Sequence, residues 1–455
     1  MKPTKEINHV ERVRGILDQN AFSFDRCPAM DSALGERVRQ RLHTVGPTAM
    51  LFYDEPLHIV RGEGCWLFDD RGQRYLDFYN NVQSLGHGHP RVVEAVARQM
   101  ATLNVHTRYL HDDLHRYGNR LLATLPPSLD RLVLTCTGSE SNDLALRLAR
   151  HWTGRRGVIV TEAAYHGNTA AVNEVSPSSY KEGTPPDHVY TIPLASIESQ
   201  ADPGRWFADQ VRAGLSALEA RGHGCAALLV DSIFSSDGVY ADPAGFLKAA
   251  VEHIQSSGGL FIADEVQPGF GRTGEQMWGF ARHQVVPDVV TLGKPMGNGF
   301  PIAGLAAREN LLAKLALHAG YFNTFGGSTA AVAAGLAVLD VLEQEQLLDN
   351  ARRMGDDIRR KLLQRMDYHE EIGSVRGVGL FLGIDICALD GRGQPDPARA
   401  SAIINALRQR GVLIGAAGKF GHTLKVRPPL CVTQADIDFF LEHFDQALLA
   451  TRRKT

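Results

Sequence analysis

Short apolar runs recur through the middle of the chain, and each is followed by polar or glycine-rich residues and then by a helical pattern. Five of these runs are RLVLTCT, GVIVTEA, AALLVDSI, GLFIADEV and DVVTLG. Continuous apolar segments that alternate with helices are typical of a largely parallel sheet buried on both faces. The pattern therefore predicts an α/β domain, which we place at residues 76–340.

The pattern differs on both sides of this domain. Residues 57–79 hold apolar and aromatic runs separated by Gly-Glu-Gly and Asp-Asp-Arg-Gly turns, which predicts a small antiparallel meander. Residues 330–365 are good helix formers with apolar spacings of three and four, which predicts one long connecting helix. We expect this helix to lead into a smaller α+β domain, residues 341–455, which is joined by an N-terminal segment, residues 1–75, that begins with helical material.

Composition and charge exclude several classes of protein. Hydrophobic residues make up 44% of the chain and charged residues 22%, as in an ordinary globular protein. A formal net charge of -3 gives no broad basic field for binding nucleic acid. The sequence has no apolar run of the roughly 18–20 residues that span a bilayer, and its charged N-terminus does not resemble a signal peptide. We expect a cytoplasmic protein that acts on small molecules.

The cysteines and histidines do not suggest a metal site. The six cysteines lie far apart, and no two have the Cys-x-x-Cys spacing, so we expect buried or free thiols. They are Cys27, Cys65, Cys136, Cys225, Cys387 and Cys431. His111 and His115 share a helix face at a metal-ligand spacing, but no third ligand is evident, which favours a solvated helix face.

Two strand ends carry residues that could take part in catalysis, and functional residues of open α/β sheets collect at such ends. Asp264 and Glu265 follow the buried run LFIA, where a carboxylate is costly unless it meets a cation. A turn acid at the end of a strand is the alternative. Lys294 follows another apolar run, and a lysine among apolar neighbours can lose its proton near neutral pH and attack a carbonyl. A solvated loop lysine is the alternative here.

Two further strand ends complete a series. Thr137, Gly138 and Ser139 precede a helix, where free N–H groups and a hydroxyl suit a phosphate; the alternative is that Ser139 caps the helix. Tyr165 and His166 precede a glycine, and such an aromatic can stack on a flat ring, although it is more often part of the core or rim. Each signal alone has an ordinary explanation, but the four follow one another in a single domain.

Two other glycine-rich segments match nucleotide-binding motifs poorly. Residues 269–274, GFGRTG, spell G-x-G-x-x-G, yet a dinucleotide fingerprint opens a long helix, whereas the following residues allow only a short one. In LGKP, Pro295 stands where a Walker A loop needs Ser or Thr. A nicotinamide-dependent oxidoreductase is therefore the least favoured alternative.

From about residue 45 to its end the chain resembles the class III pyridoxal-phosphate aminotransferases. The motifs GHGHP, TGSESND, YHG, ADEVQPGFGRTG, LGKPMGNGFP, FNTFGGS and VRPPL occur in the family's order. The resemblance implies fold type I, with a large domain around a mostly parallel sheet flanked by helices and a smaller α+β domain. It also implies pyridoxal 5'-phosphate as the cofactor and a homodimer with active sites at its interface.

The resemblance also implies roles for the residues that would hold the cofactor. Gly138 and Ser139 would bind its phosphate. Tyr165 would stack on the pyridine ring with His166 beside it, and Gln267 would contact the ring hydroxyl.

Catalytic and substrate roles follow from the same motifs. Lys294 would hold the cofactor as a Schiff base and later move the proton, and Asp264 would pair with the protonated pyridine nitrogen. Thr324 would reach the cofactor phosphate of the neighbouring subunit. Arg427 would bind the substrate carboxylate, a task for which a planar bidentate donor is suited.

The reaction itself has two interpretations. The segments NNVQSLGHGHP, RYLHDDLHRYGNRLLATLP and GSESNDLALRLAR resemble the branch of alanine–glyoxylate-like aminotransferases and phosphoethanolamine phospho-lyases. We expect transfer of an amino group from an amine or amino acid to a keto acid such as pyruvate or glyoxylate. The alternative is elimination of phosphate from a phosphorylated amine, which a basic residue such as Arg108 would favour. Asp231 and Ser232 replace the family's usual Glu-Pro, and the shorter carboxylate leaves open how Arg427 is neutralised without an anionic substrate.

Overall fold

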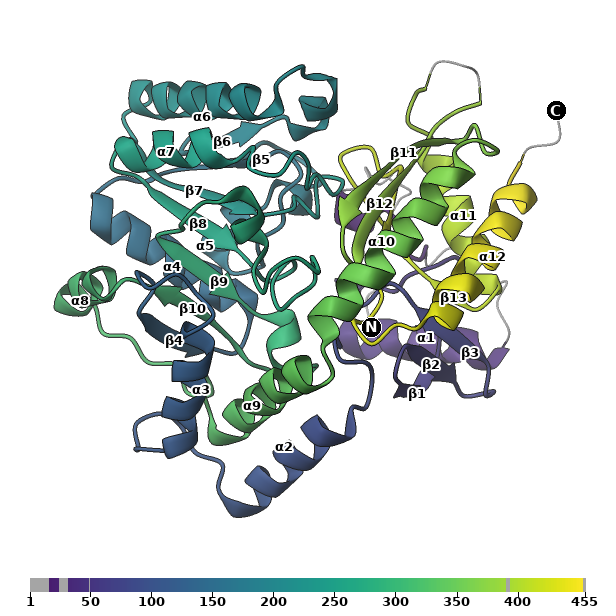
Figure 1. The fold of residues 1–455 in the computed structure, drawn as a ribbon, viewed down its shortest axis with the longest axis horizontal. Coiled ribbons are helices and arrows are strands. Elements are labelled where there is room, and N and C mark those ends of the chain that lie inside the picture. Colours follow the sequence, from purple (N-terminus) through teal and green to yellow (C-terminus); the bar gives the residue numbers. More distant parts are fainter. Residues whose placement is uncertain (1–15, 24–31, 49, 390–392, 453–455) are drawn as a thin grey trace, which may run out of the picture.

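A computed structural model describes residues 16–23, 32–48, 50–389 and 393–452 (Figure 1). Its largest sheet has seven strands in the order β4-β10-β9-β8-β7-β5-β6. They are β4 (Arg131–Thr135), β5 (Gly157–Thr161), β6 (Val189–Ile192), β7 (Cys225–Asp231), β8 (Leu260–Asp264), β9 (Val289–Leu292) and β10 (Ala303–Ala307). Strands β6, β5, β7, β8 and β9 pair in parallel, whereas β10 runs antiparallel to both β9 and β4. The predicted α/β fold with a mostly parallel sheet is confirmed.

Helices bury both faces of this sheet because successive strand residues point in opposite directions. In β7, Ala227 and Leu229 belong to one apolar cluster with α4, and Leu228 and Val230 belong to another with α6 and α7. The flanking helices are α4 (Gly138–Thr153), α5 (Ala170–Glu174), α6 (Pro203–Ala220), α7 (Lys248–Ser256) and α8 (Glu309–His318). The continuous apolar runs of the sequence are therefore strands buried on both sides.

The prediction of one continuous helix over residues 330–365 is wrong, because the segment is helical but broken into two helices. Two helices, α9 (Thr329–Gln344) and α10 (Leu347–Arg365), meet at Gln346, whose φ of 50° breaks the helical path. Helix α9 is apolar and packs into the large domain, whereas the first turns of α10 begin the path to the C-terminal part (Figure 1). Apolar spacing gave no sign of this break, because both helices share one period.

A second, antiparallel sheet forms the C-terminal part, in the order β11-β12-β15-β14. Its strands and helices are β11 (Ile372–Val378), β12 (Phe381–Ile386), β14 (Gly415–Ala417), β15 (Thr423–Val426), α11 (Pro397–Gln409) and α12 (Gln434–Ala450). Helices α10, α11 and α12 pack together beside this sheet, as expected of an α+β domain (Figure 1).

The predicted meander is also present. Strands β1 (Ile59–Glu63), β2 (Trp66–Asp69) and β3 (Arg74–Asp77) pair antiparallel, and β13 (Val412–Leu413) adds in parallel to β3. The N-terminal strands thus pair with a strand of the C-terminal part. The boundaries after residues 75 and 340 stay a prediction.

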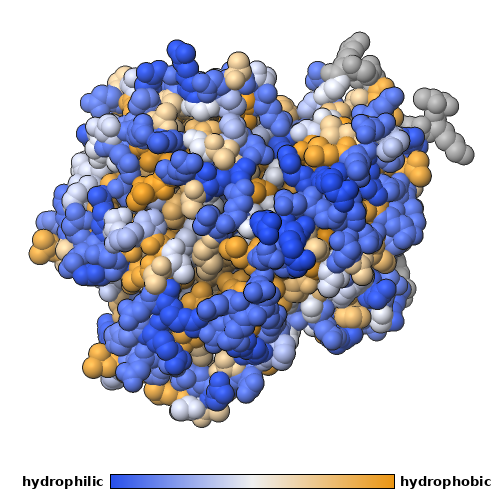
Figure 2. Space-filling model, in the orientation of Figure 1, coloured by the Kyte–Doolittle hydropathy of each residue, from blue (hydrophilic) through white to orange (hydrophobic). Residues whose placement is uncertain are grey.

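The other described elements are short or peripheral. They are η1 (Ile16–Asp18), α1 (Ser32–Val45), α2 (Pro90–Thr102), α3 (Asp112–Leu122), η3 (Pro177–Ser179), η4 (Leu194–Ser199), η5 (Gly279–His283) and η6 (Lys294–Gly297). Hydrophilic side chains dominate the face in Figure 2, with smaller hydrophobic areas between them. Within the described ranges, no helix combines the length and apolar character needed to cross a bilayer.

Candidate active site

A cavity of about 340 Å³ opens where the parallel strands of the large sheet end. Seven of the nine residues predicted for the site line it: Gly138, Ser139, Tyr165, His166, Asp264, Gln267 and Lys294. Asp231 lines it as well. The strand ends therefore bring these side chains together in one cavity, as predicted, and their individual roles stay predictions.

The start of helix α4 forms one wall of the cavity, and Thr137, not Ser139, caps this helix. Thr137 Oγ1 accepts a hydrogen bond from the Glu140 N–H at 3.2 Å, and Glu140 Oε2 accepts one from the Thr137 N–H at 2.9 Å. The alternative that Ser139 is the cap is wrong. The Ser139 hydroxyl instead faces the loop after β5 and accepts from the Asn168 N–H at 3.1 Å. The Ser139 hydroxyl can still donate its own hydrogen, and such a donor beside the first N–H groups of a 16-residue helix fits a phosphate.

Two glycines allow the backbone to come this close. A Cβ on Gly138 would lie 2.9 Å from Val266 Cγ2. Gly167 has a φ of 141°, and a Cβ there would lie 2.4 Å from Ser139 Oγ. A side chain at either position would therefore push the helix start away from the strand ends.

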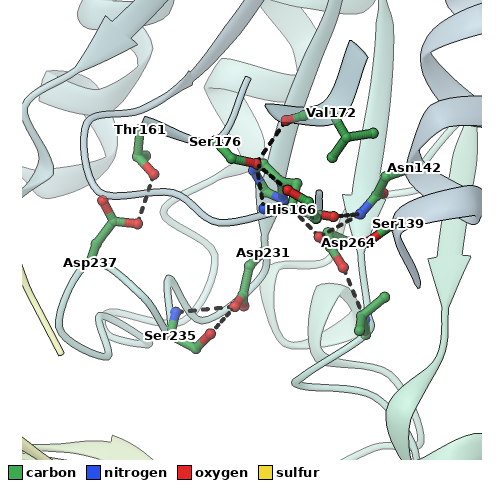
Figure 3. A network of polar contacts seen from close by, with 12 residues as sticks. Ser139, Asn142, Thr161, His166, Val172, Ser176, Asp231, Ser235, Asp237 and Asp264 are labelled. Carbon is green, nitrogen blue, oxygen red and sulfur yellow. Dashed lines mark hydrogen bonds and ion pairs between the residues drawn. The ribbon is translucent and has the colours of Figure 1, made fainter. Parts of the chain in front are cut away.

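Asp264 is fixed at the end of β8 by three hydrogen-bond donors (Figure 3). Its Oδ2 lies 2.7 Å from His166 Nδ1 and accepts from Asn142 Nδ2 at 3.0 Å, while Oδ1 accepts from the Val266 N–H at 3.1 Å. The side chain is almost fully buried. A carboxylate held in this way is suited to face a protonated ring nitrogen.

Asn142 is a site residue that sequence reasoning missed. Besides Asp264 it binds the His166 carbonyl at 2.8 Å, so it joins α4 to the loop after β5. It is fully buried. The sequence did contain a sign of this role, since Asn142 is a polar amide on the otherwise apolar inner face of a helix. A buried amide in such a place needs hydrogen-bond partners.

Lys294 begins the short helix η6, separated by one residue from the end of β9, with a φ of 35° that non-glycine residues rarely adopt. Burial lowers the pKa of its ammonium group below the usual value, while the nearby Asp264 carboxylate acts in the opposite direction. A lysine whose pKa is lowered is more often neutral and hence nucleophilic. This agrees with the expectation drawn from its apolar neighbours.

Arg427 is a buried cation next to the cavity. Its Nη1 donates to Gln267 Oε1 at 3.3 Å, and Asn81 Nδ2 donates to the same oxygen at 3.2 Å. The guanidinium carbon lies 4.9 Å from the centroid of the Tyr79 ring, and its buried Nε has no hydrogen-bond partner in the described part of the chain. Burial lowers the pKa of Arg427. A buried guanidinium without a carboxylate partner favours an anion from outside the protein.

Asp231 does not supply that anion. Its carboxylate accepts hydrogen bonds from the N–H groups of Ile233 at 3.0 Å and Ser235 at 3.1 Å, and from the Ser235 hydroxyl. These donors belong to its own loop. Burial raises the pKa of Asp231. Asp231, which stands where the family usually has Glu, therefore binds its own loop.

Three residues predicted for function do not line the cavity: Arg427 lies next to it, and Thr324 and Arg108 lie on the surface. Thr324 is exposed in the loop before α9. Arg108 is also exposed, with its guanidinium 3.8 Å from the centroid of the Phe322 ring. Neither contributes to the cavity of its own chain.

Three other sequence features were expected to have no role in the site: the GFGRTG segment, the histidine pair and the cysteines. Residues 269–274 are followed only by the short helix η5, as expected. Within the ranges that the structure covers, no cluster of ligands could hold a metal, and His111 and His115 lie at the start of α3. The described cysteines are free thiols, whereas Cys27 lies outside the described residues.

The comparisons with known proteins decide the family. The model for class III aminotransferases matches residues 52–448. The chain belongs to the class III aminotransferase family. It is 37% identical to ethanolamine-phosphate phospho-lyase homolog 1 of Caenorhabditis elegans, over 92% of this chain and 94% of that one. It is 38% identical to an alanine–glyoxylate aminotransferase 2-like protein of Drosophila melanogaster, over 92% and 88%.

Among solved structures, the fold is similar to that of a phospholyase from Arthrobacter in complex with phosphoethanolamine. The TM-score is 0.87 at 40% identity, and the match covers 91% of this chain and 99% of that one. The protein is thus an enzyme of fold type I, and pyridoxal phosphate is its cofactor. When bound, this cofactor supplies an electron sink for a carbanion beside the amine nitrogen. The helix start at Ser139, the fixed Asp264 and the partly buried Lys294 fit its phosphate, ring nitrogen and aldehyde.

Proposed function

We propose that this class III enzyme eliminates phosphate from a small phosphorylated amine of the phosphoethanolamine type. The observation that carries the proposal is the buried Arg427 beside the cavity, which has no carboxylate partner among the described residues. A transaminase that alternates between an anionic keto acid and a plain amine must neutralise this cation in one half-reaction, and Asp231 is held by Ile233 and Ser235. A phosphate monoester supplies an anion in every turnover.

The residues of the cavity can serve such an elimination. Lys294 lines the same cavity as Asp264, and its amine would take the proton from the carbon that bears the substrate's amine. The C–O bond to phosphate then breaks, and the electron pair leaves with the phosphate. With one water, phosphoethanolamine gives acetaldehyde, ammonia and inorganic phosphate. The likeness to the Arthrobacter phospholyase supports this reaction.

A second candidate is amino transfer from an amino acid to a keto acid such as pyruvate or glyoxylate. The Drosophila relative favours it, and Arg427 suits a carboxylate as well as a phosphate. Because both substrates would then carry a carboxylate, the unpaired guanidinium is compatible with this reaction too.

We also propose that the enzyme is a homodimer. Phe322 (44% exposed) and Phe325 (73%) are exposed next to Thr324 in the chain. The His106 ring lies 5.8 Å from the Phe322 ring and stacks on Tyr109 (63%), which Leu110 (93%) follows. A surface of this kind is typical of a protein interface. A second copy over it would bring Thr324 near the partner's cavity, as the family resemblance implies.

Holoenzyme assayed with phosphoethanolamine alone, and with alanine plus pyruvate or glyoxylate, distinguishes the two reactions. We expect release of inorganic phosphate without any keto acid. Arg427→Lys should lower kcat/KM for phosphoethanolamine by roughly ten- to a hundredfold, because lysine cannot make two parallel charged hydrogen bonds. Keto-acid-dependent amino transfer with no phosphate release would contradict the proposal.

A further inference from the structure

The loop after β7, residues 232–238, ties the cavity wall to the C-terminal domain. Three of its backbone carbonyls accept hydrogen bonds from that domain. They are Ser235 O from Lys425 Nζ at 2.9 Å, Ser236 O from the Gly418 N–H at 2.9 Å and Gly238 O from Arg376 Nε at 2.8 Å. The loop is therefore anchored on one side by residues of β15, β11 and the turn before β15.

On its other side the loop reaches the large sheet through Asp237 (Figure 3). Asp237 Oδ2 accepts from Thr161 Oγ1 at 2.7 Å, and Oδ1 accepts from the Ala163 N–H at 3.1 Å. The side chain is only 5% exposed. Thr161 is the last residue of β5, which pairs with β7, so the carboxylate bridges two strand ends.

The segment that Asp237 holds leads directly into the cavity. Tyr165 lines it two residues after Ala163, and His166 follows, with its Nδ1 2.7 Å from Asp264 Oδ2. Displacement of the Ala163 backbone would therefore move both side chains relative to Asp264.

We propose that Asp237 is a positioning residue, which fixes residues 161–166 so that Tyr165 and His166 stand in place for the cofactor. Through residues 232–238 it also joins this wall to the domain that carries Arg427. The proposal concerns cofactor placement, so it holds for elimination and for amino transfer alike.

The electrostatic surroundings make this contact sensitive to pH. Burial raises the pKa of Asp237 to about 7, and the Asp231 carboxylate acts in the same direction. The hydrogen bonds from Thr161 and Ala163 and the charge of His166 act the other way. The Lys425 amine also faces Asp231 and Asp237, and burial lowers its pKa well below the usual value. The ionised carboxylate accepts both hydrogen bonds best, so residues 161–166 should loosen as the pH falls through about 7.

The test compares Asp237→Asn with Thr161→Val. The Asn side chain keeps the shape of Asp but does not titrate, and it replaces one of the two acceptor oxygens by an uncharged N–H donor. Thr161→Val removes one donor and leaves the carboxylate. Two quantities are measured between pH 6 and 8: amide hydrogen exchange of residues 161–166 in the apoprotein, and the dissociation constant of pyridoxal phosphate.

We expect Asp237→Asn to speed exchange in this segment and to weaken cofactor binding about tenfold at pH 8, with no further change near pH 7. Thr161→Val should weaken binding less and keep the pH dependence. Wild-type exchange and affinity in Asp237→Asn would overturn the proposal. If that variant does not fold, Thr161→Val decides alone, because wild-type exchange and affinity in it would also overturn the proposal.

Discussion

At the residue scale, the two adjacent acids at the end of β8 have different environments. Asp264 faces the cavity and is held by His166 and Asn142. Glu265 is fully buried, and its carboxylate accepts from the N–H groups of Gly279 at 2.7 Å and Phe280 at 2.8 Å. Only Asp264 can therefore act on a bound cofactor, while Glu265 binds the backbone of the next segment.

We predict that Asp264→Asn retains the cofactor and loses most activity. An uncharged partner no longer favours the protonated pyridine nitrogen, and a charged hydrogen bond contributes about 1.5–3 kcal/mol, so kcat should fall at least about tenfold. Steady-state rates and the visible spectrum of the bound cofactor measure this. Glu265→Gln is the matched control and should keep wild-type kcat. A wild-type rate in Asp264→Asn would mean that this carboxylate is only a strand-end acid.

The sequence predicted residues whose surroundings follow from their place at a strand end, such as Asp264 and Lys294. It did not predict Asn142, because the partners of this amide, Asp264 and the His166 carbonyl, come from other elements and meet it only in the folded chain. The capping residue of α4 was missed for a related reason, since Thr137 and Ser139 both suit a cap and only the backbone geometry selects Thr137.

At the scale of elements, two neighbouring residues at the start of α4 have different tasks: Thr137 stabilises the helix, and Ser139 is expected to bind the cofactor. We predict that Thr137→Ala lowers the free energy of unfolding by about 1 kcal/mol, because the Glu140 N–H loses its cap. Ser139→Ala, two residues away, should leave the free energy of unfolding of the apoprotein nearly unchanged and weaken binding of pyridoxal phosphate. Urea unfolding of the apoprotein and cofactor titration measure the two effects. An equal loss in the free energy of unfolding in both variants would contradict these two distinct tasks.

Other elements show where periodicity stops being informative. Strand β10 was not predicted, because its sequence, AGLAA, lacks the β-branched residues that mark the neighbouring strands. A Cβ on Gly304 would lie 2.7 Å from the Val133 carbonyl oxygen, so small residues allow this strand to fit between β4 and β9. The break between α9 and α10 was missed because it depends on the backbone of Gln346 and not on apolar spacing.

At the scale of the whole molecule, buried carboxylates make stability depend on pH. Burial raises the pKa of Glu265 to about 7. The folded protein therefore holds this proton more tightly than the unfolded chain, so the contribution of Glu265 to stability is present at low pH and is lost as the pH rises through about 7.

We predict that Glu265→Gln, which cannot ionise, becomes more stable relative to the wild type as the pH rises from about 5 to about 8. The change should be on the order of 1–3 kcal/mol in the free energy of unfolding. Urea unfolding of both apoproteins at the two pH values measures it. If the difference in the free energy of unfolding between the two proteins stays constant with pH, or changes in the opposite direction, then folding does not raise the pKa of Glu265.

We propose that the cavity at the strand ends is a pyridoxal-phosphate site with Lys294 as its covalent anchor. Borohydride reduction of the holoenzyme, followed by proteolysis and mass spectrometry of the peptides, tests it most directly. Lys294 follows β9 and lines the same cavity as Asp264 and Ser139. We predict a pyridoxyl group on the peptide that contains Lys294 and no covalent label in Lys294→Ala. A label on another lysine, such as the buried Lys425, or no label at all, would contradict this role of Lys294.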